Sequence, residues 1–216
     1  MKLQTILITL GFLFLGAGCA PQVNTYETPP KSKEVFIKTD FTAANRAEWK
    51  QNAQWSDLCD EDFKIGSNAG LSGLAIYPIT DNESILRVIC GVYAYQNSML
   101  FYHLDTSTSK TTVTLLSIPT YDIERKQVVA RNYEYEDDIP GYVLGNDSFD
   151  STNKTISIFT KERGVGDCGS RLIFTASKTP TLLKIQSLTC EQVEQFKFEN
   201  PEATKPPEWP VIYEKK

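Results

Sequence analysis

The stretch CGSRLIFTASKTPTLLKIQSLTC, residues 168–190, decides the fold because it contains two strand patterns around a single turn. Residues 171–177 and 182–189 are short runs rich in apolar and β-branched side chains, which favour extended strands. Lysine, threonine and proline at 178–180 supply the turn between them. The sequence therefore predicts an antiparallel hairpin.

The two cysteines at the ends of this stretch fit the hairpin. Folding the chain about Thr179 places Ile173 opposite Ile185, and the same count brings Cys168 opposite Cys190. Opposite residues of an antiparallel pair lie close enough for a disulfide. We therefore predict a Cys168–Cys190 bond.

The amino-terminal residues MKLQTILITLGFLFLGAGCA indicate export. Lys2 precedes an apolar segment, residues 6–15, which has the length of a secretory signal and is too short to span a bilayer. Small residues at 16–18 lead into Cys19, an arrangement that resembles the lipobox of bacterial lipoproteins. The resemblance implies cleavage after residue 18 and acylation of Cys19 by chains such as palmitate.

An ordinary secretory signal cut near Ala17 or Ala20 is the alternative, and it also exports the chain. With lipidation, the acyl chains are the membrane anchor. Ala20, in place of an aspartate after the lipid cysteine, favours the outer membrane. We therefore expect a lipid-anchored protein of the bacterial cell envelope that faces the periplasm.

Four cysteines remain after Cys19, and an even set outside the cytoplasm predicts two disulfides. The hairpin accounts for Cys168 and Cys190. On nearness in sequence alone, we favour Cys59–Cys90 as the other bond.

The chain divides into a signal peptide at 1–18, a lipidated tether at 19–34, a single β-rich domain at 35–199 and a proline-rich tail at 200–216. The net charge of −5 comes with scattered lysines and arginines, so the sequence lacks the basic patch of a nucleic-acid-binding protein. We expect no nucleic acid partner.

Strand patterns dominate the domain. Besides the hairpin, they cover residues 73–78, 84–95, 98–104, 111–118, 127–131 and 155–160, with turn residues between them, as at 145–147. About eight short strands at this spacing predict a mainly β fold, either an antiparallel sandwich or a partly open barrel. One or two short helices are expected, at 43–51 with Thr42 as N-cap and at 191–196.

One segment carries a further pattern, K-x-R-G-x-G-D-C-G, formed by Lys161, Arg163, Gly164, Gly166, Asp167, Cys168 and Gly169. Together with Trp55 ahead of Cys59 and the tyrosines at 93 and 95, it resembles the signature of a family of uncharacterised exported bacterial proteins, cyanobacterial members included. The resemblance covers residues 45–195. It implies a β-rich, disulfide-bonded domain outside the cytoplasm, without an established activity.

The same loop supplies the candidate site. Gly164 and Gly166 indicate a backbone with positive φ or a close approach to a neighbour. We expect Arg163 and Asp167 to flank an exposed loop that recognises a partner, with the planar guanidinium group of Arg163 donating the hydrogen bonds. We therefore expect a binding or structural module with a protein partner in the cell envelope, and with no catalytic residue, cofactor or metal.

Two alternative functions use this segment. The loop at 163–170 suits an envelope inhibitor that enters the active site of a hydrolase, and in this it resembles small periplasmic lysozyme inhibitors. Residues 166–170 also resemble the nucleophile loop of chymotrypsin-fold cysteine proteases, with Cys168 as nucleophile and His103 as base. The third member of that triad is Asp147 or Asp150.

Two other motifs each lack a required part. Residues 164–169 match G-x-G-x-x-G, but a strand pattern follows where a dinucleotide site needs a helix. The acidic run with Glu134, Glu136, Asp137 and Asp138 does not have the spacing of a calcium-binding loop.

Overall fold

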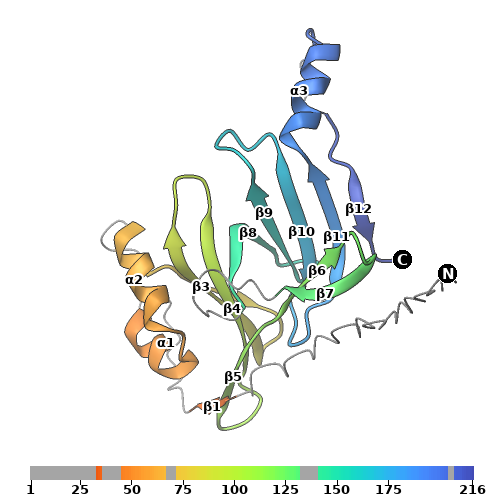
Figure 1. The fold of residues 1–216 in the computed structure, drawn as a ribbon. Coiled ribbons are helices and arrows are strands. Elements are labelled where there is room, and N and C mark those ends of the chain that lie inside the picture. The colour runs from red at the N-terminus through yellow and green to blue at the C-terminus, as the bar shows by residue number, and fades with distance from the viewer. Residues whose placement is uncertain (1–32, 36–44, 67–71, 132–140, 204–206) are drawn as a thin grey trace, which may run out of the picture.

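The computed structural model describes residues 33–35, 45–66, 72–131, 141–203 and 207–216, which form a mainly β, antiparallel fold with short helices, as predicted (Figure 1). The strands are β1 (Lys33–Val35), β2 (Leu74–Pro78), β3 (Glu83–Val92), β4 (Asn97–Asp105), β5 (Thr111–Leu115), β6 (Ile118–Asp122), β7 (Gln127–Arg131), β8 (Val143–Asp150), β9 (Thr155–Lys161), β10 (Gly169–Thr175), β11 (Leu182–Leu188) and β12 (Val211–Glu214). The helices are α1 (Arg46–Ala53), α2 (Asp57–Gly66) and α3 (Cys190–Glu199).

Strand β4 joins two halves of one large sheet. One edge of β4 pairs with β3, from Asn97↔Val92 to Asp105↔Glu83. The other edge is shared, because residues 102–105 pair with β5 and residues 97–99 pair with β8. The first half-sheet thus contains β1 to β5, and the second contains β8 to β12 in chain order.

The two half-sheets enclose the main hydrophobic core. It contains Ile85 and Phe101 from the first half-sheet and Ile156 and Phe174 from the second, all fully buried. Strands β8 and β9 lie between β4 and β10, so a flat sheet would separate Phe101 from Phe174 by about 14 Å. Their ring centroids are 6.3 Å apart, edge to face. The sheet is therefore curled, and its two halves face each other.

Helices α1 and α2 cover the opposite face of the first half-sheet (Figure 1). Trp49 and Trp55 are buried there against Leu86 and Leu100. The predicted Cys59–Cys90 disulfide is confirmed, and it fastens α2 to β3. Helix α2 was not predicted from the sequence, although Cys59 and Phe63 show the spacing of four residues that places two side chains on one helical face.

Strands β6 and β7 form a separate two-stranded ribbon. Ile118 of the ribbon is fully buried in the main core. Tyr121 packs on Tyr213 of β12, with ring centroids 5.0 Å apart. Side-chain packing therefore holds the ribbon against the second half-sheet.

The predicted hairpin forms from β10 and β11, but its register differs by one residue. Leu172, rather than Ile173, lies opposite Ile185, and a bulge between Ile173 and Phe174 shifts the pairing again. Next to the turn, Phe174 pairs with Leu182, two positions from the predicted register, because the turn is centred one residue before Thr179. The bulge adds one residue to β11 and so reduces the difference to one position. The predicted Cys168–Cys190 bond is confirmed, since Cys168 lies just before β10 and Cys190 begins α3.

Three further segments differ from the sequence-based expectation. Residues 145–147 lie within β8, not in a turn. Helix α1 is capped by Asn45, whose side chain accepts a hydrogen bond from the Glu48 amide, while Thr42 lies outside the described residues. Within the predicted proline-rich tail, Val211–Glu214 pairs with β11 as the edge strand, so the folded domain extends beyond residue 199.

None of the helices in the described part of the chain is long and apolar enough to cross a membrane. The predicted signal peptide, Cys19 and the acidic run at 134–138 lie outside the described residues. The last residues of the predicted tether do not, because Lys33 and Glu34 belong to β1 and pair with β5.

Candidate functional site

The loop between β9 and β10, residues 162–168, contains the four predicted partner-binding residues and is tied to α3. Cys168 at its end is bonded to Cys190. At its start, the Glu162 carboxylate accepts a hydrogen bond from the Cys190 amide at 3.3 Å, and the Glu162 amide donates to the Cys168 carbonyl at 3.2 Å. Both ends of the loop are therefore held in place.

Arg163 and Asp167 pair with each other across this loop. The Nε and Nη2 atoms of Arg163 donate to the two carboxylate oxygens of Asp167, each at 2.7 Å. Arg163 also pairs with Glu194, and Asp167 with Lys197, both on α3. The hydrogen bonds from Arg163 hold the pKa of Asp167 well below its usual range, so the carboxylate is ionised at neutral pH. The charged groups assigned to a partner thus bind each other and α3.

The turn between β3 and β4, residues 93–96, lies beside this loop. The Gln96 side chain accepts a hydrogen bond from the Lys161 amide at 3.1 Å. A Cβ atom on Gly164 would lie 2.4 Å from Cε1 of Tyr95. Glycine at this position therefore allows the Tyr95 ring to rest on the loop backbone.

We call residues 93–96 and 162–168 together the apex. Figure 1 shows both turns and α3 at one end of the molecule, with β1 and β5 at the other. At the apex, Val165 is 79 % exposed and Tyr95 is 58 % exposed. Exposed apolar and aromatic side chains on a backbone with fixed ends are typical of a binding surface.

The cysteine protease hypothesis needs a free thiol on Cys168 next to a histidine. The Cys168 sulfur is bonded to Cys190, and the residue is fully buried. His103 lies toward the Asp105 end of β4, away from the apex, and its Nε2 is 3.2 Å from the Glu83 carboxylate. The described residues therefore do not bring a nucleophile and a base together at the apex.

Asp147, a candidate for the triad, belongs to a partly buried network between the half-sheets. The Tyr77 hydroxyl donates to the Asp147 carboxylate, and the Arg87 Nε atom lies 3.5 Å from it. Burial, together with the Asp147 charge, raises the pKa of Tyr77 to about 12. Because the three residues lie on β2, β3 and β8, the network connects the two half-sheets. Asp150 instead accepts backbone hydrogen bonds in the turn that follows β8.

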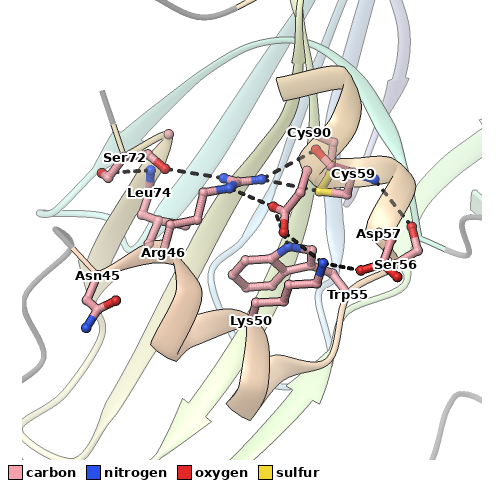
Figure 2. A network of polar contacts seen from close by, with 12 residues as sticks. Asn45, Arg46, Lys50, Trp55, Ser56, Asp57, Cys59, Ser72, Leu74 and Cys90 are labelled. Atoms are coloured by element: carbon pink, nitrogen blue, oxygen red, sulfur yellow. Dashed lines mark hydrogen bonds and ion pairs between the residues drawn. A yellow bond between two sulfur atoms is a disulfide. The ribbon is translucent and has the colours of Figure 1, made fainter. Parts of the chain in front are cut away.

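A second polar network, which no sequence motif indicated, joins α1 and α2 (Figure 2). The Asp60 carboxylate accepts hydrogen bonds from Arg46 Nε at 2.8 Å and Trp55 Nε1 at 3.0 Å, and it pairs with Lys50 at 2.9 Å. Burial opposes ionisation of Asp60, but the bonds from Lys50, Trp55 and Arg46 outweigh it and lower the pKa of Asp60. The Arg46 guanidinium also lies 4.1 Å from the centroid of the Phe63 ring.

The same guanidinium connects three segments of the chain. It donates to the Ser72 carbonyl at 3.3 Å and lies 3.5 Å from the Cys59 carbonyl, next to the Cys59–Cys90 disulfide (Figure 2). Arg46 thus holds α1, α2 and the segment that enters β2 against one another. All of these partners are groups of the protein itself, and their contacts position α1, α2 and the segment before β2. We therefore interpret the network as structural.

One group of potential metal ligands occurs in the described part of the chain, namely Glu162, Cys168 and Cys190. The sulfurs of the two cysteines are bonded to each other, whereas a cysteine binds a metal ion as a free thiolate. This group therefore offers a single carboxylate and does not indicate a metal site.

Together, the curled sheet, the two disulfides and the apex define a mainly β, disulfide-stabilised domain that displays two loops at one end. The chain belongs to the family described as "Protein of unknown function (DUF1176)", which matches residues 16–179. The match ends in the turn before β11, so β11, α3 and β12 lie beyond it. The comparison with curated proteins and the comparison with solved structures each gave no match.

Proposed function

We propose that the protein is an extracytoplasmic binding module that recognises a protein partner through its apex. The observation that carries this proposal is the exposure of Val165. This large apolar side chain is 79 % exposed on a loop with both ends fixed. While it is exposed, this side chain contributes little to the stability of the fold. Covering it with a partner removes apolar surface from water and stabilises the complex.

The bracing of the loop supports this function. The disulfide and the ion pairs of Arg163 and Asp167 restrict the backbone before any partner arrives. Binding therefore costs less conformational entropy than it would for a loose loop. In this proposal Arg163 and Asp167 shape the loop, while Val165 and Tyr95 make the contact.

The proposed lipid anchor fits this orientation. Strand β1 pairs with the edge of β5, at the end of the sheet opposite the apex (Figure 1). Cys19 precedes Lys33 by 14 residues, which span at most about 50 Å when extended. Acylation of Cys19 would then attach the protein to the membrane by one end and leave the apex directed into the periplasm.

Photo-crosslinking tests the apex directly. A photoreactive amino acid at position 165 is expected to form an adduct of discrete mass with one envelope protein in living cells. Position 123, which is 66 % exposed at the turn of the β6–β7 ribbon, is the matched control and should not form this adduct. The same adduct from both positions, or none from position 165, would contradict the proposal.

The inhibitor of a hydrolase is a second candidate, and one observation favours it. Loops that block active sites are usually rigid, and residues 162–168 are fixed at both ends. The test is inhibition of a purified lysozyme by the protein, with relief by Val165→Asp. If the wild-type protein and Val165→Asp inhibit equally, the apex is not the inhibitory surface.

A further inference from the structure

A cavity of about 160 Å³ lies between the β6–β7 ribbon and the second half-sheet. Leu172 of β10 and Ile185 of β11 form its floor and are part of the main core. Thr120 and Tyr121 of β6 line the opposite wall. The cavity is separate from the apex, because none of residues 93–96 and 162–168 lines it.

The chemistry of the lining excludes a charged ligand from the cavity itself. All the residues that line it are uncharged, and they are either aliphatic or carry a hydroxyl group, as do Ser170 and Ser187. An ion transferred from water to this space would lose its hydration without gaining a counter-charge. The lining therefore favours hydrocarbon, with hydroxyl groups nearby for a single polar atom.

The mouth of the cavity is apolar as well. Ile123 and Ile212 line it and are 66 % and 37 % exposed. Val128, the cross-strand neighbour of Tyr121 on the ribbon, is 44 % exposed. These aliphatic side chains extend the apolar surface from the buried floor to the solvent, as an elongated hydrocarbon would require.

The ribbon gives the site a movable wall. The strands β6 and β7 pair only with each other, and the described contacts of Ile118 and Tyr121 hold them to the sheet. A wall without a backbone hydrogen-bond ladder can shift to admit a ligand at a lower cost than a strand inside the sheet.

From these observations we propose that the cavity binds the alkyl chain of an uncharged amphipathic molecule, with about six carbons enclosed. The size follows from volume, because a dry cavity of about 150 Å³ holds a six-carbon ring. A linear chain fits better than a ring, since the aliphatic mouth continues the apolar path beyond the cavity.

The test uses linear primary alcohols from butanol to octanol, titrated into the full-length protein and followed by the NMR signals of the Ile185 and Ile212 methyl groups. The affinity is expected to rise about fourfold for each added methylene up to hexanol and by a smaller factor for each methylene beyond it, where the chain lies on the partly exposed mouth. Saturable shifts without dependence on chain length, or no saturable shift at all, would overturn the proposal.

A pair of variants locates the binding. Ser170→Leu fills the cavity and is expected to weaken hexanol binding at least tenfold. Ser157→Leu, a matched change on β9 at a position paired with Ser148, should bind hexanol as the wild type does. Thr120→Leu fills the cavity from the ribbon side and replaces Ser170→Leu if that variant does not fold. Equal binding by the filled and control variants would place the alcohol elsewhere and refute the site.

Discussion

Arg46 illustrates how much of this fold depends on single polar side chains. Its guanidinium bonds to Asp60, reaches the Ser72 carbonyl and lies over the Phe63 ring. Only 15 % of the Arg46 side chain and 16 % of the Asp60 side chain are exposed, so solvent screens the pair less than a surface ion pair. Removing the Asp60 charge leaves the Arg46 guanidinium without a counter-charge in a poorly hydrated place.

We therefore expect Asp60→Asn to lower the free energy of unfolding by about 2 kcal/mol. The variant retains the size of the side chain but removes the charge that Arg46 and Lys50 share. Glu61→Gln, an exposed acidic residue on the same helix, is the control and should change stability by less than about 0.5 kcal/mol. Urea unfolding measures both; equal effects would show that the network does not hold the helices.

His103 is the one histidine of the chain, so it reports on a pH range in which no other side chain ordinarily titrates. Burial lowers its pKa, although Glu83 and Asp105 act in the opposite direction. The folded protein thus binds a proton at His103 less readily than the unfolded chain does. The stability that His103 contributes is complete above about pH 6.5 and is lost as the pH falls through its lowered folded pKa.

His103→Phe should remove this dependence. We expect the free energy of unfolding of the wild type to fall between about pH 7 and pH 5, and that of His103→Phe to change less over the same interval. Carboxylates with lowered pKa values, such as Asp60 and Asp167, lose their contributions only below about pH 4 and do not interfere. Parallel curves for the two proteins would contradict the assignment.

At the scale of the element, residues 200–216 contain a strand that their proline-rich composition does not indicate. Prolines predict an extended tail over this range, and within it Val211–Glu214 form a strand that pairs with β11. Trp209 packs edge to face on Phe159 at 5.4 Å and lies in the cluster around the Cys168–Cys190 disulfide. An extended segment joins a sheet only if another strand offers a free edge. The sequence of the segment does not show whether such an edge exists.

Deleting residues 207–216 should therefore lower the free energy of unfolding by about 3 kcal/mol or more, because Trp209 and the β11–β12 hydrogen bonds are lost together. Deleting Lys216 alone is the control and should have no measurable effect. Chemical denaturation followed by circular dichroism measures both. A truncated protein as stable as the control would mean that β12 does not stabilise the sheet.

How well the other strands and helices could be predicted depends on whether their signals are local in the sequence. The strands around the β10–β11 turn and the helix after Thr189 have local signals, since apolar runs and capping residues act within a few positions. Strand β8 was missed because Gly145 and Asn146 favour turns locally, whereas pairing with β9 overrides that preference. The hairpin register was wrong because the turn is centred on Lys178 rather than on Thr179, and the bulge then shifts the pairing by one position.

At the scale of the whole molecule, the proposed architecture has a lipid anchor at one end and the apex at the other. Cys19→Ala is expected to move the protein from the membrane fraction to the soluble fraction, because acyl chains stabilise membrane association by about 0.8 kcal/mol per buried CH₂. Ala20→Ser, next to the cysteine, should remain in the membrane fraction. An intact mass of the wild type without acyl chains would contradict lipidation.

Of the candidate site, the sequence located the loop but did not indicate the contacts that its charged residues make within the protein. Glycine and charge patterns singled out residues 163–167, because backbone freedom and a guanidinium fork are properties of single residues. The partners of Arg163 are Asp167 in the loop and Glu194 on α3. Glu194 is 31 positions away, and its place depends on where α3 begins after β11.

By itself, the sequence determined the mainly β class, most of the strands and both disulfide pairs, because alternation, turn residues and cysteine spacing act over short distances along the chain. Tertiary structure alone decided that Tyr95 rests on Gly164, that Arg46 spans three segments and that a cavity lies under the β6–β7 ribbon. These features join residues far apart in the chain. The contact of Tyr95 and the cavity under the ribbon depend on how the sheet curls, and the contacts of Arg46 depend on how α1 and α2 pack on it.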